Sequence, residues 1–309
     1  MAADRARVAA ADTALSAARV AERETLGREI EGLDALDVPL VEPEPASRRV
    51  WRAVWPKLTA VGLVLAFWQI VVWTGWRPPW VLPGPARVFS ELGELVTTAK
   101  FWSAVGTTLR RAATGFGLAI LIGTALGVGV SRSRILRRAF GSFITGLQSM
   151  PSIAWFPFAI LLFKLSESAI LFVVVIGASP SIANGLVSGI DHIPPLLLRA
   201  GRVLGARGLA SLRHVVLPAA LPGYVAGLKQ GWAFSWRSLM AGELLVIIES
   251  RPALGSQLQF ARDLSDAPAL LALMVVVLAI GILVDDLVFA TLERRIRSRR
   301  GLVEVGGAP

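Results

Sequence analysis

The sequence predicts an all-α integral membrane protein with about six transmembrane helices. Hydrophobic residues make up 54% of the 309 residues and charged residues 17%, and the hydrophobic residues gather in runs. Each run approaches the roughly 20 residues with which a helix crosses the hydrocarbon core of a bilayer. Because the runs lack the apolar and polar alternation of a membrane β-barrel, helices are expected. The expected spans are Leu58–Thr74, Ala112–Val130, Ile144–Phe163, Ile170–Ile190, Leu217–Ile248 and Ala267–Leu287.

The chain divides into a polar tail and a membrane domain. Residues 1–46 hold five basic and ten acidic side chains and end in a proline-rich stretch, which predicts a flexible cytoplasmic tail. The expected parts of the remainder are the transmembrane domain 47–309, its first span 57–75, an extracytoplasmic surface segment 82–100, and a core 106–290 that contains a polar loop at 191–218. Prolines up to Pro85 restrict regular helix in the surface segment, so an amphipathic helix is expected at Ala86–Thr97.

The distribution of Lys and Arg predicts the orientation. The segments 47–57, 131–138, 191–216 and 293–301 together hold 17 basic residues, and the three segments on the opposite side hold eight. The positive-inside rule then places both termini in the cytoplasm. Arg110 and Arg111 lie on the outer side against this rule, and either an ion pair with Glu91 or Glu94 or a lipid headgroup would accommodate them.

The composition excludes several classes of function. The chain has no Cys and two His, which leaves no disulfide, thiol chemistry or histidine metal cluster. It has no Gly-x-x-x-x-Gly-Lys-Ser/Thr sequence, so it does not bind ATP through a P-loop. The net charge of +10 combines −5 in residues 1–46 with +15 in the remainder, and that positive excess lies mostly in the segments that flank the membrane, where it sets topology and contacts anionic lipid rather than nucleic acid.

Glycines and prolines inside the spans predict how the helices pack. Glycines recur at four-residue spacing in the second, fourth and fifth spans, which allows close approach of helices in lipid. They are Gly123 and Gly127, Gly185 and Gly189, and Gly223, Gly227 and Gly231. Packing within one chain explains this spacing, and a dimer seam is an alternative. Pro151, Pro157 and Pro180 predict bent or broken helices that face protein or a water-filled path.

The loop at 191–218 has the pattern of a docking element. Two short helices are expected there, separated by Gly205 and Gly208, and Pro218 opens the fifth span. Apolar residues at helical spacing (Leu197, Ala200, Val203, Leu204) are flanked by Arg199, Arg202 and Arg207. Such a helix suits a groove of another protein, and equally suits the lipid surface under the positive-inside rule.

The same loop resembles the Glu-Ala-Ala motif of bacterial ABC importer permeases. Ala200, Gly205, Val215, Leu217 and Pro218 match that motif, whereas Arg199 and Gly201 replace its usual Glu and Ala. The resemblance to permeases for aliphatic sulfonates, taurine and nitrate extends from about residue 82 to residue 302. Where those permeases usually have Trp-Phe-Gly-x-Gly-Glu, this chain keeps Phe163 and Glu167 but has Lys164 and Ser166 in place of the glycines.

The resemblance implies a type I ABC importer permease fold, like that of the methionine importer, in the bacterial cytoplasmic membrane. It implies two copies of an ABC ATPase, which bind ATP and Mg²⁺, a second permease copy in a homodimer, and an extracytoplasmic solute-binding protein. The chain itself would be no enzyme and would bind no cofactor. A small anionic solute is expected, first of all an aliphatic sulfonate, with taurine, nitrate or a small heterocycle as alternatives. The rival function is an ion-coupled secondary transporter, which would need buried carboxylates near the midplane.

Charged and polar residues in the fifth span are candidates for the translocation path. The residues expected to line it are Ser235, Trp236, Arg237, Ser238 and Glu243. An anionic solute favours Arg237 or Lys229, and the alternative is a structural ion pair with a carboxylate of a neighbouring helix. Asp285 and Asp286 are expected to reach the membrane interface beside Arg294 and Arg295.

Overall fold

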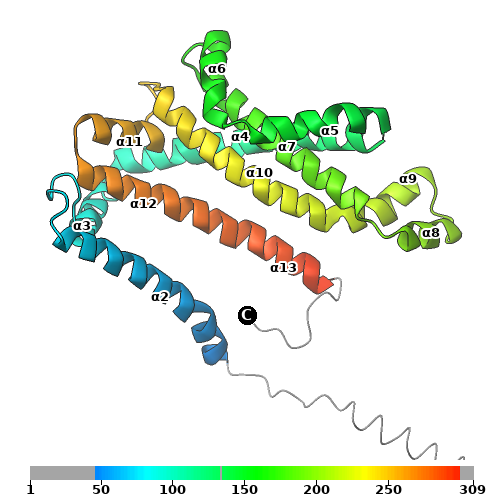
Figure 1. The fold of residues 1–309 in the computed structure, drawn as a ribbon, viewed down its shortest axis with the longest axis horizontal. Coiled ribbons are helices and arrows are strands. Elements are labelled where there is room, and N and C mark those ends of the chain that lie inside the picture. Colours follow the sequence, from blue (N-terminus) through cyan, green and yellow to red (C-terminus); the bar gives the residue numbers. More distant parts are fainter. Residues whose placement is uncertain (1–45, 133, 300–309) are drawn as a thin grey trace, which may run out of the picture. The chain divides into compact units, whose positions relative to one another are not determined.

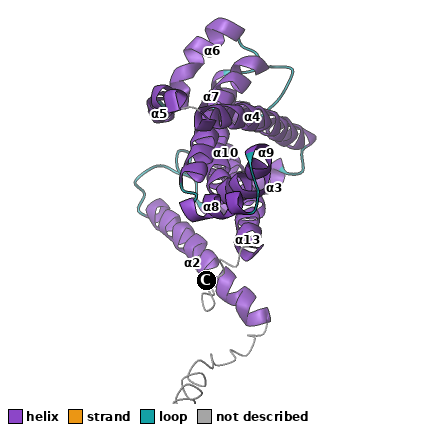
Figure 2. Cartoon of the chain, turned by 90° about the vertical axis from the view of Figure 1, so that its right-hand side faces the viewer, coloured by secondary structure: helices purple, strands orange, loops and turns teal. Residues whose placement is uncertain are grey.

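The computed structural model describes residues 46–132 and 134–299, and every regular element in these residues is a helix (Figure 2). The predicted tail at 1–46 lies outside the described residues except for Ala46. The helix α2 (Ala46–Trp73) contains the first predicted span except for its last residue, Thr74, and α3 (Pro85–Leu95) confirms the predicted amphipathic helix. The helices from α3 onward belong to one compact unit, which begins at Gly62 (Figure 1).

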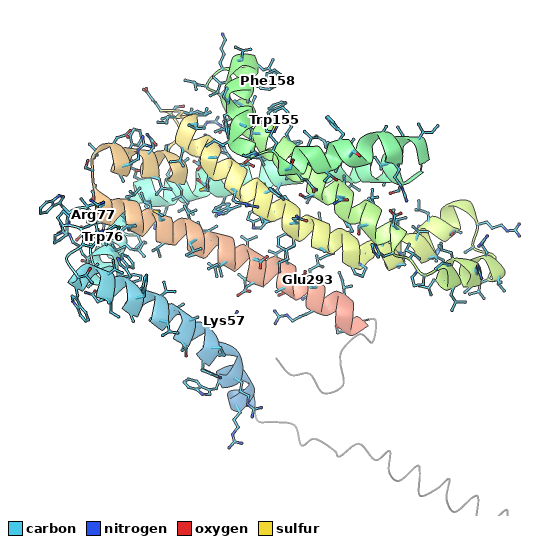
Figure 3. All side chains as sticks on the ribbon, viewed as in Figure 1. Lys57, Trp76, Arg77, Trp155, Phe158 and Glu293 are labelled. Carbon is cyan, nitrogen blue, oxygen red and sulfur yellow. The ribbon has the colours of Figure 1, made fainter. Side chains whose placement is uncertain are left out.

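The third predicted span is a broken helix. The helix α5 (Arg134–Ser149) ends before Pro151, a 3₁₀ turn follows at Ser152–Trp155, and α6 is Phe156–Phe163. The two halves meet at 101°, with Trp155 and Phe158 just after the break (Figure 3). The bend or break expected from the prolines of the third span is therefore confirmed.

Three long helices form the centre of this unit: α4 (Ala99–Arg132), α7 (Glu167–Asp191) and α10 (Leu217–Leu245). The helix α7 packs against both others, and it continues through the buried Pro180 without interruption (Figure 1). A Cβ atom on Gly185 would lie 2.4 Å from the Cα of Gly227, and one on Gly223 would lie 2.5 Å from the Cα of Gly189. The close approach predicted from glycine spacing therefore occurs between α7 and α10 of one chain.

The predicted loop contains α8 (Pro195–Val203), α9 (Gly208–Ser211) and a π-helical turn at Leu212–Val216 that leads into α10. After α10 comes α11 (Leu254–Asp263), which the sequence pattern did not predict. The chain then forms α12 (Ala267–Val284), a second π-helical turn at Asp285–Phe289, and α13 (Ala290–Arg299).

Four helical segments within the described residues are long and apolar enough to cross a membrane, or five when the bent α5–α6 pair counts as one span. The four are Val54–Trp73, Ala99–Ser131, Glu167–Asp191 and Ala267–Ile296. The helix α10, expected as a span, has 29 residues but is not among them. The charged side chains of Lys229, Arg237 and Glu243 lower the mean hydropathy of α10. The contacts of these three side chains are described with the candidate site.

Candidate functional site

The end of α8 is a tight turn that only glycine fits well. The N–H of Ala206 donates to the carbonyl of Gly201 at 2.9 Å, and the N–H of Gly205 donates to the carbonyl of Arg202 at 3.1 Å. This pair of bonds is the Schellman arrangement, whose central residue takes a left-handed conformation. Gly205 has a φ of +84°. The predicted interruption between the two short helices is therefore a defined hydrogen-bonded turn.

The α8 helix is fixed on one side and open on the other. Gly201 is buried, and a Cβ there would lie 2.8 Å from a methyl group of Val215, so a larger residue would separate α8 from the π-helical turn. Val203 and Leu204 are 87% and 86% exposed, and Leu196 is 74% exposed. The predicted Arg199, Arg202 and Arg207 are exposed beside them. The turn thus presents apolar and cationic side chains together, as a docking surface does.

The residues predicted to line a translocation path separate into two groups. Ser235, Ser238 and Glu243 are buried within the chain, and both serine hydroxyl groups lack a hydrogen-bond partner among the described residues. A Cβ on Gly177 of α7 would lie 2.7 Å from the Oγ of Ser238, so that serine faces α7. Trp236 and Arg237 instead line a cavity on another side of α10.

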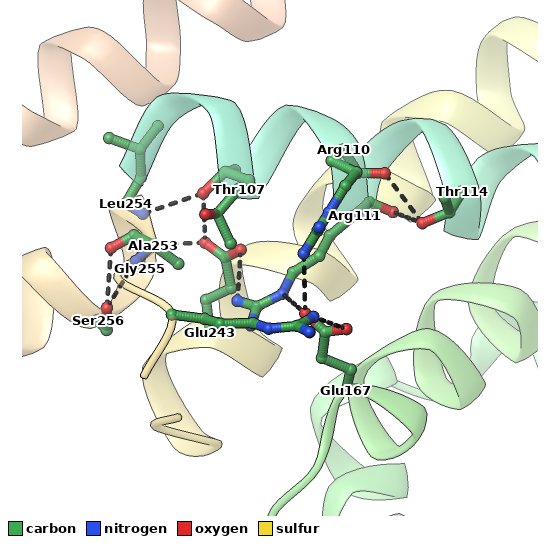
Figure 4. Close-up of polar contacts among 12 residues, drawn as sticks. Thr107, Arg110, Arg111, Thr114, Glu167, Glu243, Ala253, Leu254, Gly255 and Ser256 are labelled. Atoms are coloured by element: carbon green, nitrogen blue, oxygen red, sulfur yellow. Dashed lines mark hydrogen bonds and ion pairs between the residues drawn. The ribbon is translucent and has the colours of Figure 1, made fainter. Parts of the chain in front are cut away.

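Glu243 is the centre of a buried polar network (Figure 4). Its carboxylate is fully buried and accepts hydrogen bonds from Thr108 Oγ1 at 2.8 Å, the Gly255 N–H at 3.1 Å and Arg111 Nη1 at 3.1 Å. A Cβ on Gly255 would lie 2.4 Å from the Cβ of Glu243, so glycine lets the amide come this close. The network ties α10 to α4 and to the start of α11.

Glu167, at the start of α7, extends this network toward the surface. Arg110 Nη2 and Arg111 Nε each donate to its Oε1 at 3.3 Å, and Arg251 pairs with its other oxygen. The two arginines that seemed misplaced on the outer side are therefore paired with Glu167 and Glu243, and neither Glu91 nor Glu94 is their partner.

Glu91 and Glu94 lie in a separate acidic neighbourhood at α3. Partial burial raises the pKa of Glu91, and the nearby carboxylates of Asp266 and Glu94 raise it further, while Arg87 lowers it.

Lys229 forms the structural ion pair considered as the alternative to a path role. Its Nζ lies 3.3 Å from Asp285 Oδ2, which joins α10 to the π-helical turn after α12. Asp285 thus pairs with a lysine of α10, although Arg294 and Arg295 had been expected beside it.

A cavity of about 510 Å³ lies between α10 and α12. From α10 it is lined by Trp232, Trp236 and Arg237, and its other end holds Asp285 and Asp286. The two tryptophan rings stack with centroids 5.8 Å apart. The Arg237 guanidinium lies 4.7 Å from the centroid of the Phe234 ring. The cavity therefore combines an aromatic wall, one cation and a pair of carboxylates.

Comparison with known proteins agrees with this architecture. Residues 115–298 match the family described as the inner membrane component of binding-protein-dependent transport systems. The chain belongs to that family. It is consequently a multi-pass inner membrane protein, and the resemblance noted from the loop motif is confirmed.

Several curated permeases cover most of the chain. The taurine transport system permease protein of Escherichia coli is 26% identical over 86% of this chain and 99% of its own length. The riboflavin transport system permease protein of Chloroflexus aurantiacus is 30% identical over 75% of this chain and 86% of that protein. A putative aliphatic sulfonates transport permease protein of Escherichia coli is 28% identical over 74% of this chain and 86% of that protein.

The fold also matches solved transporters. An inward-facing structure of the MetNI methionine ABC transporter superposes with a TM-score of 0.55 at 21% identity, over 64% of this chain and 96% of that chain. An amino acid ABC transporter crystallised with histidines superposes with a TM-score of 0.54 at 18% identity, over 66% of this chain and 97% of that chain. These likenesses establish the predicted importer-permease fold.

Sequence reasoning missed Thr108, Arg111 and Gly255 as partners of Glu243, and it missed Glu167 as the second carboxylate that contacts Arg111. One signal was present: Arg110, Arg111, Glu167 and Glu243 are charged residues at or near span ends, and such charges require compensation. Which charge meets which depends on tertiary packing across more than 50 residues of sequence.

Proposed function

We propose that this chain is the permease subunit of an ATP-binding-cassette importer, in which a separate ATPase drives transport through α8. The support is the α8 turn itself, a short helix held by a Schellman turn with Val203 and Leu204 almost fully exposed between arginines. Family membership favours a protein partner over lipid for this surface. The complete importer would contain two permeases, two ATPases and a solute-binding protein.

In this mechanism ATP shifts the permease between two conformations. ATP closes the ATPase pair, and a ligand changes such an equilibrium only by as much as it binds one state better than the other. Force would enter through α8 and reach α10 directly, because the π-helical turn at Leu212–Val216 is continuous with α10 at Leu217 and Pro218. The excess of basic residues supports a cytoplasmic position for α8 and for both termini in this proposal.

The solute is proposed to be a small anion, with aliphatic sulfonates first. Taurine, nitrate and small heterocycles are the alternatives, since relatives of similar identity are named for taurine, sulfonates and riboflavin. Ligand binding by the partner solute-binding protein would decide among them. Growth of a deletion strain on a sulfonate as the sole sulfur source would then test the assignment in cells.

The decisive experiment concerns the exposed face of α8. Val203→Asp combined with Leu204→Asp is expected to abolish co-purification of the partner P-loop ATPase and ATP-dependent uptake into proteoliposomes. Leu264→Asp is the matched control, because Leu264 is 80% exposed after α11. If the α8 variant binds the ATPase and transports like wild type, α8 is not the coupling element.

A further inference from the structure

We propose that Arg237 is the anion-contacting residue of the translocation path and that it receives a sulfonate or carboxylate group in the cavity between α10 and α12. This inference rests on the proposed function and specifies the site at which the solute is bound within the membrane. It assigns different roles to charged residues that belong to the same helix.

The first argument is the position of Arg237 along α10, which the proposed function takes as a membrane span. Gly231 is the middle residue of the 29-residue α10, and Arg237 lies six positions beyond it. At 1.5 Å per residue this is about 9 Å along the helix axis. The hydrocarbon core extends about 15 Å from its centre, so the Cα of Arg237 lies within it when α10 spans the membrane centrally.

The second observation is the direction of the side chain. Arg237 Nε donates to the carbonyl of Ala233 at 3.1 Å, and its guanidinium lies over the ring of Phe234. Both contacts are toward the start of α10, and therefore toward the membrane centre. A lipid-facing arginine would instead extend to the nearer interface.

The third observation is the charge balance of α10. Glu243 is paired with Arg111, and Lys229 is paired with Asp285. Arg237 has no ion pair with any described residue, and its side chain is exposed at the cavity. An uncompensated cation in a membrane span is costly unless water or an anion meets it, and rings of Arg or Lys are how anion pathways select charge.

The shape of the cavity indicates the kind of anion. Its lining runs from Met274 of α12 to Asp286 of the π-helical turn that follows, which is about 18 Å at about 1.5 Å per residue. Beside Arg237 the wall is the Trp232–Trp236 stack, and at the far end are carboxylates. An organic anion with a short apolar body fits this arrangement, with its anionic group on Arg237 and its body on the tryptophan rings.

The absence of cysteine from the chain allows a direct test in the complete importer. Arg237→Cys, in proteoliposomes with ATPase and binding protein, is expected to react with the water-soluble sulfonate reagent 2-sulfonatoethyl methanethiosulfonate. Excess solute is expected to slow this reaction. Leu121→Cys is the control, because Leu121 is 68% exposed on α4 and is not part of the cavity lining; it is expected to stay unreacted.

Transport measurements complete the test. Arg237→Gln is expected to lower uptake of the anionic solute about tenfold or more, the usual scale for losing a charge-assisted hydrogen bond. Arg237→Lys should retain part of the activity, and Arg262→Gln, a surface arginine change on α11, should retain all of it. ATPase co-purification should be unchanged in all three variants.

Each contrary outcome has a definite meaning. No reaction at Arg237→Cys would place this face against lipid, and an oxidant-induced disulfide between two copies without reagent labelling would assign it to a subunit contact; either overturns the inference. Normal anion uptake by Arg237→Gln with an intact ATPase complex overturns it while the importer function stands. If no ATPase associates with the wild-type chain, the proposed function fails first.

Discussion

The Glu243 network should be the most sensitive point of the fold. Glu243→Ala removes a fully buried carboxylate with three hydrogen-bond donors, one of them Arg111. Removing one partner of a buried ion pair typically costs about 3–5 kcal/mol, because the other charge is left uncompensated. Arg111 retains its contact with the partly exposed Glu167, so a loss of about 3 kcal/mol in unfolding free energy is expected.

A double-mutant cycle separates the pair from its surroundings. Arg111→Met removes the cation while keeping much of its apolar stem, and the double variant with Glu243→Ala should be more stable than the sum of the single losses predicts, by about 2 kcal/mol. Unfolding in mixed detergent micelles, followed by the fluorescence of the ten tryptophans, measures each value. Arg262→Ala is the control, since its exposed pair with Asp263 should contribute less than about 1 kcal/mol. Additive losses, or a single loss under about 1 kcal/mol, would refute the reasoning.

Three further predictions concern backbone geometry. Lys164 has φ 58° and ψ −163°, a backbone conformation that almost only glycine adopts. Lys164→Gly should therefore raise the unfolding free energy by about 1 kcal/mol or more in the same micelle assay. A lower unfolding free energy in this variant would contradict the prediction. Gly185→Ala places a Cβ 2.4 Å from the Cα of Gly227 and should destabilise by about 1–3 kcal/mol, whereas Gly117→Ala, with nothing within 4 Å, should not. Gly205→Pro cannot adopt φ +84° and should abolish ATP-coupled uptake while membrane insertion stays normal, whereas Gly205→Asn should retain uptake; full uptake with proline would argue against the coupling role.

The elements that depend on local sequence could be predicted. Gly205 and Gly208 interrupt two short helices, and both have positive φ, because only glycine adopts that conformation without strain. The Pro151 break and the four-residue glycine spacing in α7 and α10 follow from equally local rules. The departure at Lys164 was visible as a lysine in place of a usual glycine, and its physical consequence, a backbone conformation unsuited to lysine, required the structure.

The elements that depend on distant partners could not be predicted. The helix α11 is short and only partly apolar, so its pattern resembles a loop, and it is held in place by the Gly255 N–H bond to Glu243 and the Leu254 N–H bond to Thr108. The angle between α5 and α6 is likewise set by packing of the turn at Ser152–Trp155 on α7 and α10. A proline predicts that a helix breaks, but it does not predict the direction in which the second half of the helix continues.

The charges of α10 show most clearly how far sequence reasoning extends. In the sequence Lys229, Arg237 and Glu243 are equivalent, because each is an ionisable residue within an apolar stretch and each suggests a function. In the structure Lys229 forms an ion pair with Asp285, and Glu243 forms a buried ion pair with Arg111, so an opposite charge already compensates each of them. Only Arg237 keeps its charge directed at a cavity. Since an ion pair within the protein removes the need for a solute or water, the partner rather than the residue type distinguishes a structural charge from one that acts on the solute.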